Sequence, residues 1–130
     1  MTARLLPGQI IPGTRYKVLA KVGQGAMGVV YAAEHVDLEK RVAIKLLAGR
    51  VAQRPDAVER FRNEARTASK IGSPYICDVT DFGTLEDGRV FLVMEYLEGP
   101  SLRAVLDHEG HVEPARAIPI LRQVAKALGA

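Results

Sequence analysis

The stretch Gly23-Gln24-Gly25-Ala26-Met27-Gly28-Val29-Val30 organises this chain of 130 residues. Its glycines let backbone amides approach a ligand closely, because no Cβ stands in the way. Successive N–H groups in such a loop can form a concavity that suits a phosphate. The spacing G-x-G-x-x-G is common in glycine-rich turns, so the flanking sequence decides what this loop can do.

The segments on both sides of the loop read as β-strands. Residues 16–22 alternate between apolar and polar side chains, and residues 29–33 are β-branched or aromatic. The unit is therefore a strand–loop–strand hairpin. A P-loop would require Gly-Lys-Ser/Thr at its end, whereas Val29 follows Gly28. A dinucleotide-binding loop would run into a helix whose N-terminus meets the pyrophosphate, and none is expected here.

The same periodicities predict three further strands, over residues 41–47, 76–82 and 90–94. Residues 49–55 connect the third strand to a helix that begins near Asp56 and ends at Gly72-Ser73-Pro74. Two more helices finish the chain, one capped by Ser101 and one beginning near Pro114. The last helix carries an apolar stripe, and no later element of this sequence is expected on which the stripe could pack.

Composition indicates a globular protein, with 48% hydrophobic and 25% charged residues. The net charge of +3 comes from scattered basic residues, and aromatic residues make up 5% of the chain, so we expect no nucleic-acid partner. A modest positive balance suits a small anionic ligand such as a nucleotide. The single cysteine, Cys77, cannot form an internal disulfide and is interpreted as a small core residue.

Residues 1–13 contain two Pro-Gly breaks and are expected to form a loosely ordered, flexible leader. These breaks interrupt the apolar core that a signal peptide requires. The longest apolar runs are about five residues, far short of the ~20 that span a bilayer. We therefore expect a cytoplasmic segment without a membrane span.

Lys45 and Glu64 are the candidate chemical groups. Lys45 ends an apolar strand, a position where a lone lysine is usually a solvated charge. Glu64 lies three residues after Phe61 and four before Ala68, on or beside the apolar stripe of its helix. An inward glutamate is costly unless it is paired, so Lys45 is the expected partner. The alternative is that Glu64 is a surface acid that pairs with Arg60.

Three motifs together resemble the small lobe of the protein kinase fold. They are Gly23-x-Gly25-x-x-Gly28-x-Val30, Val42-Ala43-Ile44-Lys45 and the helical Glu64. Residues 25–35 are similar to bacterial serine/threonine kinases of the eukaryotic-like type. The resemblance covers residues 14–130 and implies an α+β fold. It implies a small lobe over residues 14–98, with a five-stranded antiparallel sheet and one helix. Two helices of an incomplete large lobe would follow over residues 99–130.

The resemblance also implies an ATP site. The loop would cover the phosphates through its backbone, Lys45 would contact the α- and β-phosphates, and Glu64 would position Lys45. Apolar side chains would sandwich the adenine, and the backbone of the connector that follows the fifth strand, residues 95–100, would bind its edge. The implied ATP contacts are Val22, Gly23, Gln24, Gly25, Ala26, Met27, Gly28, Val30, Ala43, Lys45, Met94 at the back of the pocket, Glu95 and Leu97.

Asp81-Phe82-Gly83 spells the magnesium-binding tripeptide of the family, but it precedes the connector and follows no catalytic loop. We interpret Asp81 as a decoy and assign no metal ligand to this chain. The sequence has no His-Arg-Asp, so the catalytic base, the activation segment and the carboxylates that organise the transferred phosphoryl are missing.

Two interpretations follow. In the first, the chain is the ATP-binding piece of a serine/threonine kinase whose full length uses ATP, Mg²⁺ and a protein substrate. The chain alone would then be inactive and bind ATP weakly or not at all. In the second, it is a non-catalytic small-lobe module that binds and regulates a partner protein.

Overall fold

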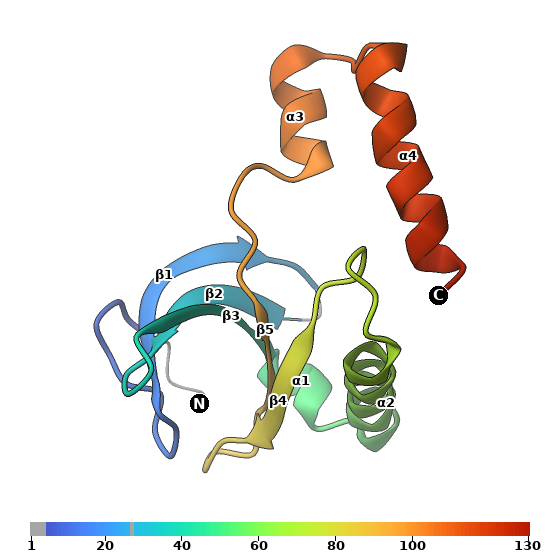
Figure 1. Cartoon of the computed structure of the whole chain (residues 1–130). Helices are drawn as coiled ribbons and strands as arrows, with labels where there is room; N and C mark the ends of the chain where they lie inside the picture. Colours follow the sequence, from blue (N-terminus) through green and yellow to red (C-terminus); the bar gives the residue numbers. More distant parts are fainter. Residues whose placement is uncertain (1–4, 27) are drawn as a thin grey trace.

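The computed structural model describes residues 5–26 and 28–130 (Figure 1). Five antiparallel strands form one curved sheet in the order β1-β2-β3-β5-β4. The strands are β1 (Tyr16–Gln24), β2 (Gly28–His35), β3 (Lys40–Leu47), β4 (Val79–Thr84) and β5 (Val90–Glu95). The helices are α1 (Gly49–Ala52), α2 (Pro55–Ile71), α3 (Leu102–Glu109) and α4 (Pro114–Leu128). The predicted α+β architecture is confirmed.

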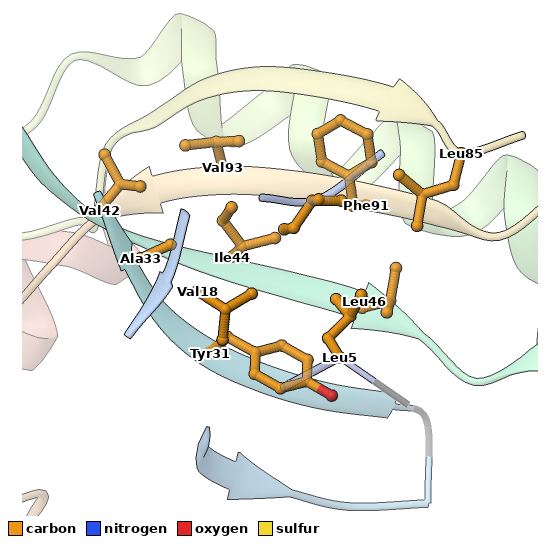
Figure 2. Close-up of a cluster of buried hydrophobic side chains, with 11 residues drawn as sticks. Leu5, Val18, Tyr31, Ala33, Val42, Ile44, Leu46, Leu85, Phe91 and Val93 are labelled. Carbon is orange, nitrogen blue, oxygen red and sulfur yellow. The ribbon is translucent and has the colours of Figure 1, made fainter. Parts of the chain in front are cut away.

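One face of the sheet carries a core of alternate strand residues, as the two-residue period of a strand requires (Figure 2). Val18, Ile44 and Val93 are fully buried at its centre. Around them the cluster contains Leu5, Ile11, Tyr31, Ala33, Val42, Leu46, Leu85 and Phe91. This core draws apolar side chains from β1, β2, β3 and β5, so it helps to hold these strands in register.

The segment 5–13 packs on this core and differs from the loosely ordered leader expected for residues 1–13. Leu5 and Ile11 are buried in the cluster. The Gly8 N–H donates to the Val18 carbonyl at 2.7 Å, and the Val18 N–H donates to the Gln9 carbonyl at 2.8 Å. The Pro-Gly breaks therefore bend this segment back along β1, where its two large apolar side chains are removed from water.

The opposite face of the sheet is covered by α2. Its buried residues Ala57, Phe61 and Ala65 recur every four positions and pack against Leu47 and Leu92. Gly72 ends the helix in the left-handed conformation, with φ 66°. This is the face on which the candidate ATP residues Val30, Ala43, Lys45 and Met94 lie.

Two boundaries differ from the sequence prediction. Residues 49–52 form the short helix α1 within the segment expected to be a plain connection. The fourth strand begins at Val79 rather than at residue 76, because Ile76 is held in a turn where its N–H donates to the Ser73 carbonyl at 3.2 Å. Neither difference changes the order of the strands.

Helices α3 and α4 follow the connector after β5 and stand apart from the sheet (Figure 1). Ser101 caps α3, as predicted, by accepting the Ala104 N–H at 3.1 Å. The end of α4 approaches the loop after α2, where the Lys126 ammonium lies 5.3 Å from the centre of the Tyr75 ring. The apolar stripe of α4 is exposed at Ile118, Leu121, Val124 and Leu128. No helix within the described ranges combines the length and apolar character that crossing a bilayer requires.

Candidate functional site

The glycine loop closes the β1–β2 hairpin. Gly23 pairs with Val30, and the Gly25 N–H donates to the Gly28 carbonyl at 2.9 Å. A Cβ added at Gly25 would meet no atom within 4 Å, so the loop leaves open space there. The side-chain carbonyl oxygen of Gln24 accepts a hydrogen bond from the Lys21 ammonium at 2.7 Å. The predicted contact Met27 lies outside the described residues.

Gly28 is required for a different reason from the one the motif suggests. A Cβ at this position would overlap the Leu46 carbonyl oxygen and lie 3.1 Å from the Ala48 nitrogen. Only a glycine lets the first residue of β2 approach the backbone at the end of β3 this closely. Sheet packing alone therefore accounts for the third glycine, whatever the loop binds.

Strand register places Lys45 within reach of the loop and of an apolar row. Lys45 lies opposite Val30 of β2 and Leu92 of β5, and Ala43 lies opposite Met94. Side chains opposite each other in antiparallel strands share a face, so these residues line the face covered by α2. Ala43 is buried, whereas Val30, Lys45 and Met94 are half-buried. The predicted partners Val22 and Leu97 are exposed by 53% and 64%, at the open side of this row.

The expected pair between Lys45 and Glu64 is not formed. Lys45 makes no ion pair within 4.0 Å among the described residues, and its ammonium lies 5.8 Å from the centre of the Phe61 ring. Glu64 is exposed on α2 and does not join the buried stripe. The inward orientation expected for Glu64 is therefore wrong for this structure. Phe61, one turn earlier, takes the place beside Lys45, and the carboxylate keeps its hydration, which burial would remove.

The connector begins at Glu95, whose polar groups all face the segment before β4. Its N–H donates to the Asp78 carbonyl at 2.9 Å, and its carboxylate accepts the Asp78 N–H at 3.3 Å. Its carbonyl accepts a weak hydrogen bond from the Cys77 thiol at 3.5 Å. Burial, followed by the nearby charges of Glu95 and Asp78, raises the pKa of Cys77. Cys77 is half-buried beside the connector rather than a core residue as expected.

Asp81 lies on β4, away from Lys45 and the glycine loop. One carboxylate oxygen accepts the Phe82 N–H at 2.8 Å, and the other lies 3.4 Å from the Tyr16 hydroxyl on β1. Within residues 5–26 and 28–130, no group of three or more His, Cys, Asp or Glu side chains is arranged to hold a metal ion.

Two arginines contact the site's backbone segments, and sequence reasoning did not single them out. Arg50 of α1 donates to the Ala26 carbonyl in the glycine loop at 3.1 Å. Arg41 of β3 lies against the connector, with its guanidinium carbon 5.2 Å from the centre of the Tyr96 ring. Both are exposed arginines in a basic chain, and no local pattern distinguishes them.

Comparison with known families decides the class of protein to which the chain belongs. The family model described as "Protein kinase domain" matches residues 16–130. The chain belongs to the protein kinase family. The matched range includes the glycine loop, Lys45, the connector and both final helices, so the kinase domain assignment covers every candidate ATP residue described above.

Bacterial serine/threonine kinases are similar to this kinase domain chain. The serine/threonine-protein kinase pkn2 of Myxococcus xanthus is 40% identical over 126 residues, which are 97% of this chain and 15% of that protein. The serine/threonine-protein kinase PrkC of Bacillus subtilis is 38% identical over 95% of this chain and 19% of its own length. The chain thus spans less than a fifth of the length of these two relatives.

Among solved structures, the PknI kinase domain of Mycobacterium tuberculosis has a similar fold. It superposes with a TM-score of 0.79 at 29% identity, over 96% of this chain and 49% of that kinase domain. The likeness agrees with a small lobe followed by the first helices of a large lobe, as predicted from the sequence.

Proposed function

We propose that this chain is the ATP-binding part of a serine/threonine protein kinase, which transfers the γ-phosphoryl group of ATP to a protein hydroxyl. The observation that carries the proposal is the position of Lys45. It lies opposite Val30, beside the glycine loop and within a domain that matches the protein kinase family. The printed names of the similar bacterial kinases support serine or threonine as the acceptor.

The described residues suit ATP. The small side chain of Ala43 and its neighbours Val30 and Met94 supply an apolar row for the adenine, to which we add Val22 at the open side. The described loop residues 23–26 and 28 supply backbone N–H groups for the phosphates, with free space at Gly25. The Lys45 ammonium supplies a positive charge. We assign the adenine edge to the backbone of Leu97 and to the Glu95 carbonyl, which has a second lone pair besides the one that accepts the weak hydrogen bond from Cys77.

Glu64 is assigned to position Lys45 when nucleotide is bound. In the present arrangement Phe61 lies beside the ammonium and Glu64 faces water. The assignment therefore requires α2 to turn or shift so that Glu64 replaces Phe61 next to Lys45. The ion pair between Lys45 and Glu64 would then form only when ATP is bound and its phosphate oxygens also contact the Lys45 ammonium.

Mg²⁺ neutralises developing charge in phosphoryl transfer, and the described residues do not fit it. Asp81 uses both carboxylate oxygens on Tyr16 and Phe82, on a strand distant from the glycine loop. We propose that Asp81 is a structural residue and that carboxylates absent from this sequence hold the metal in the whole enzyme. The sequence also lacks His-Arg-Asp, so we expect the chain alone to transfer no phosphoryl group. The proposal includes a cytoplasmic location, where ATP is available.

Titration of the ¹⁵N-labelled chain with ATP tests this function. We expect weak binding, in the roughly millimolar range, with shifts of the Gly25, Lys45 and Leu97 amides. Lys45→Met should abolish the shifts, whereas Lys70→Met, on the exposed last turn of α2, should leave them intact. A folded spectrum without any shift at these amides would contradict the ATP site. Phosphoryl transfer by the purified chain that Lys45→Met abolishes would contradict the predicted inactivity.

A further inference from the structure

Arg41 of β3 contacts two residues at the start of the connector that follows β5. Its guanidinium carbon lies 5.2 Å from the centre of the Tyr96 ring, within the range of a cation–π contact. Its Nη1 lies 3.8 Å from a carboxylate oxygen of Glu98. Both contacts reach the same short segment, from one side chain of the neighbouring strand.

The register explains why Arg41 meets Tyr96. Val42 lies opposite Glu95 at the last pair between β3 and β5. The next position outward brings Arg41 opposite Tyr96. Alternation along the strands puts this position on the same face as the Ala43–Met94 pair. The arginine and the tyrosine therefore continue the row of residues that lines the proposed ATP site.

Tyr96 occupies a decisive place in the backbone. The peptide group before it carries the Glu95 carbonyl, and the peptide group after it carries the Leu97 N–H. These are the two groups that the proposed function assigns to the adenine edge. The dihedral angles of Tyr96 set the angle between them, so restraining its ring restrains both groups. Preorganised hydrogen-bonding groups lose less entropy when a ligand binds.

We propose that Arg41 is a positioning residue for the adenine-binding connector, acting through the Tyr96 ring and the Glu98 carboxylate. The proposal rests on the proposed ATP site and adds to it a residue that touches no nucleotide. Arg41 and Glu98 are both exposed, so each contact is weak by itself, and the expected effect is a loosening of the connector rather than unfolding. A planar guanidinium stacks on a ring in a way that an ammonium does not, which separates arginine from lysine here.

The test combines backbone dynamics with binding by the ¹⁵N-labelled 130-residue chain. The variants are Arg41→Ala, Arg41→Lys, Tyr96→Phe and Tyr96→Leu. Arg15→Ala is the matched control, because it removes another exposed arginine that pairs with a carboxylate. The Arg15–Asp37 pair lies at the end of the β1–β2 hairpin opposite the glycine loop. Relaxation order parameters are measured for the amides of residues 96–98. Binding is measured with ATP, adenosine and inorganic tripolyphosphate.

We expect Arg41→Ala and Tyr96→Leu to lower the order parameters of the connector from about 0.85 toward about 0.6. Tyr96→Phe keeps the ring and should match the original chain, and Arg41→Lys should be intermediate. ATP and adenosine should bind about three- to tenfold more weakly to Arg41→Ala, and tripolyphosphate should bind equally well. Arg15→Ala should change none of these values.

Unchanged order parameters in Arg41→Ala would overturn the proposal, and so would an equal loss for tripolyphosphate, which would make Arg41 a general cation instead. If ATP shifts no amide of the original chain, the ATP site itself fails. The order parameters then still decide whether Arg41 holds the connector, so the two failures are distinguishable.

Discussion

The Tyr16 hydroxyl lies 3.4 Å from a carboxylate oxygen of Asp81, which joins β1 to β4. These strands are the two edges of the sheet order β1-β2-β3-β5-β4. The sheet therefore curves so strongly that its edges meet at this point, as expected from strand twist accumulated across five strands. The Asp-Phe-Gly motif by itself would assign the Asp81 carboxylate to magnesium. In the structure this carboxylate instead joins the two edges of the sheet.

Substituting Asp81→Asn should lower the pKa of Tyr16. Burial is the largest cause that raises this pKa above 10.0, followed by the negative charge of Asp81 and its hydrogen bond. Removing the charge should move the pKa partway back toward 10.0. The Tyr16 ring carbon resonance followed against pH measures it, and Asp107→Asn on α3 is the control. An unchanged titration would show that Asp81 does not act on Tyr16.

The same contact makes a stability prediction with a definite sign. A phenol whose pKa is raised on folding binds its proton more tightly in the folded state. Its contribution to the free energy of unfolding is thus fully present below pH about 10. It is lost as the pH rises through the raised pKa. In Asp81→Asn this alkaline loss should be smaller, as chemical denaturation at pH 8 and pH 11 would measure.

Gly28→Ala should destabilise the chain, and Gly25→Ala should not. The added methyl group at residue 28 overlaps the Leu46 carbonyl, so the β2 and β3 backbones must move apart. We expect a loss of about 1–3 kcal/mol in the free energy of unfolding, typical of overpacking. At residue 25 the space is open, and a change within about 0.5 kcal/mol is expected. Urea denaturation followed by circular dichroism compares them. Equal losses would contradict the packing role of Gly28.

Ile11→Ala should cost about 2–5 kcal/mol, because the side chain is 2% exposed within the main core. Ile10→Ala is a matched control on the neighbouring residue, whose side chain is 51% exposed, and should change stability by about 0.5 kcal/mol or less. Thermal denaturation distinguishes the two. If both variants melt like the original chain, the segment 5–13 contributes nothing to the core.

Lys45 and Glu64 should show no energetic coupling in the absence of nucleotide. A double-mutant cycle with Lys45→Met and Glu64→Gln should give an interaction energy below about 0.3 kcal/mol, because no ion pair joins them. The exposed pair Arg15–Asp37, at 2.7 Å, is the reference and should give about 0.2–1 kcal/mol. A coupling above 1 kcal/mol for Lys45 and Glu64 would mean that α2 already presents the glutamate inward in solution.

The sequence by itself determined all elements except the short helix α1, and it determined their local chemistry. Alternation with a period of two identified the strands on both sides of the glycine loop, and the stripe through Phe61 and Ala65 identified α2. The Ser101 cap was predictable for the same reason, since its acceptor and donor lie within one turn. These features depend on neighbours a few residues apart, and the resemblance of the motifs then indicated the family.

Tertiary structure alone decided how the distant segments meet. Glu64 lies at the border of the stripe on α2, where the rotation of the helix against the sheet decides whether a side chain faces Lys45 or water. Asp81 meets Tyr16 because the sheet curves, and Arg41 meets Tyr96 because β3 and β5 share a register. Such contacts join residues far apart in the chain. They depend on the sum of all packing forces, and no local pattern of residues encodes them.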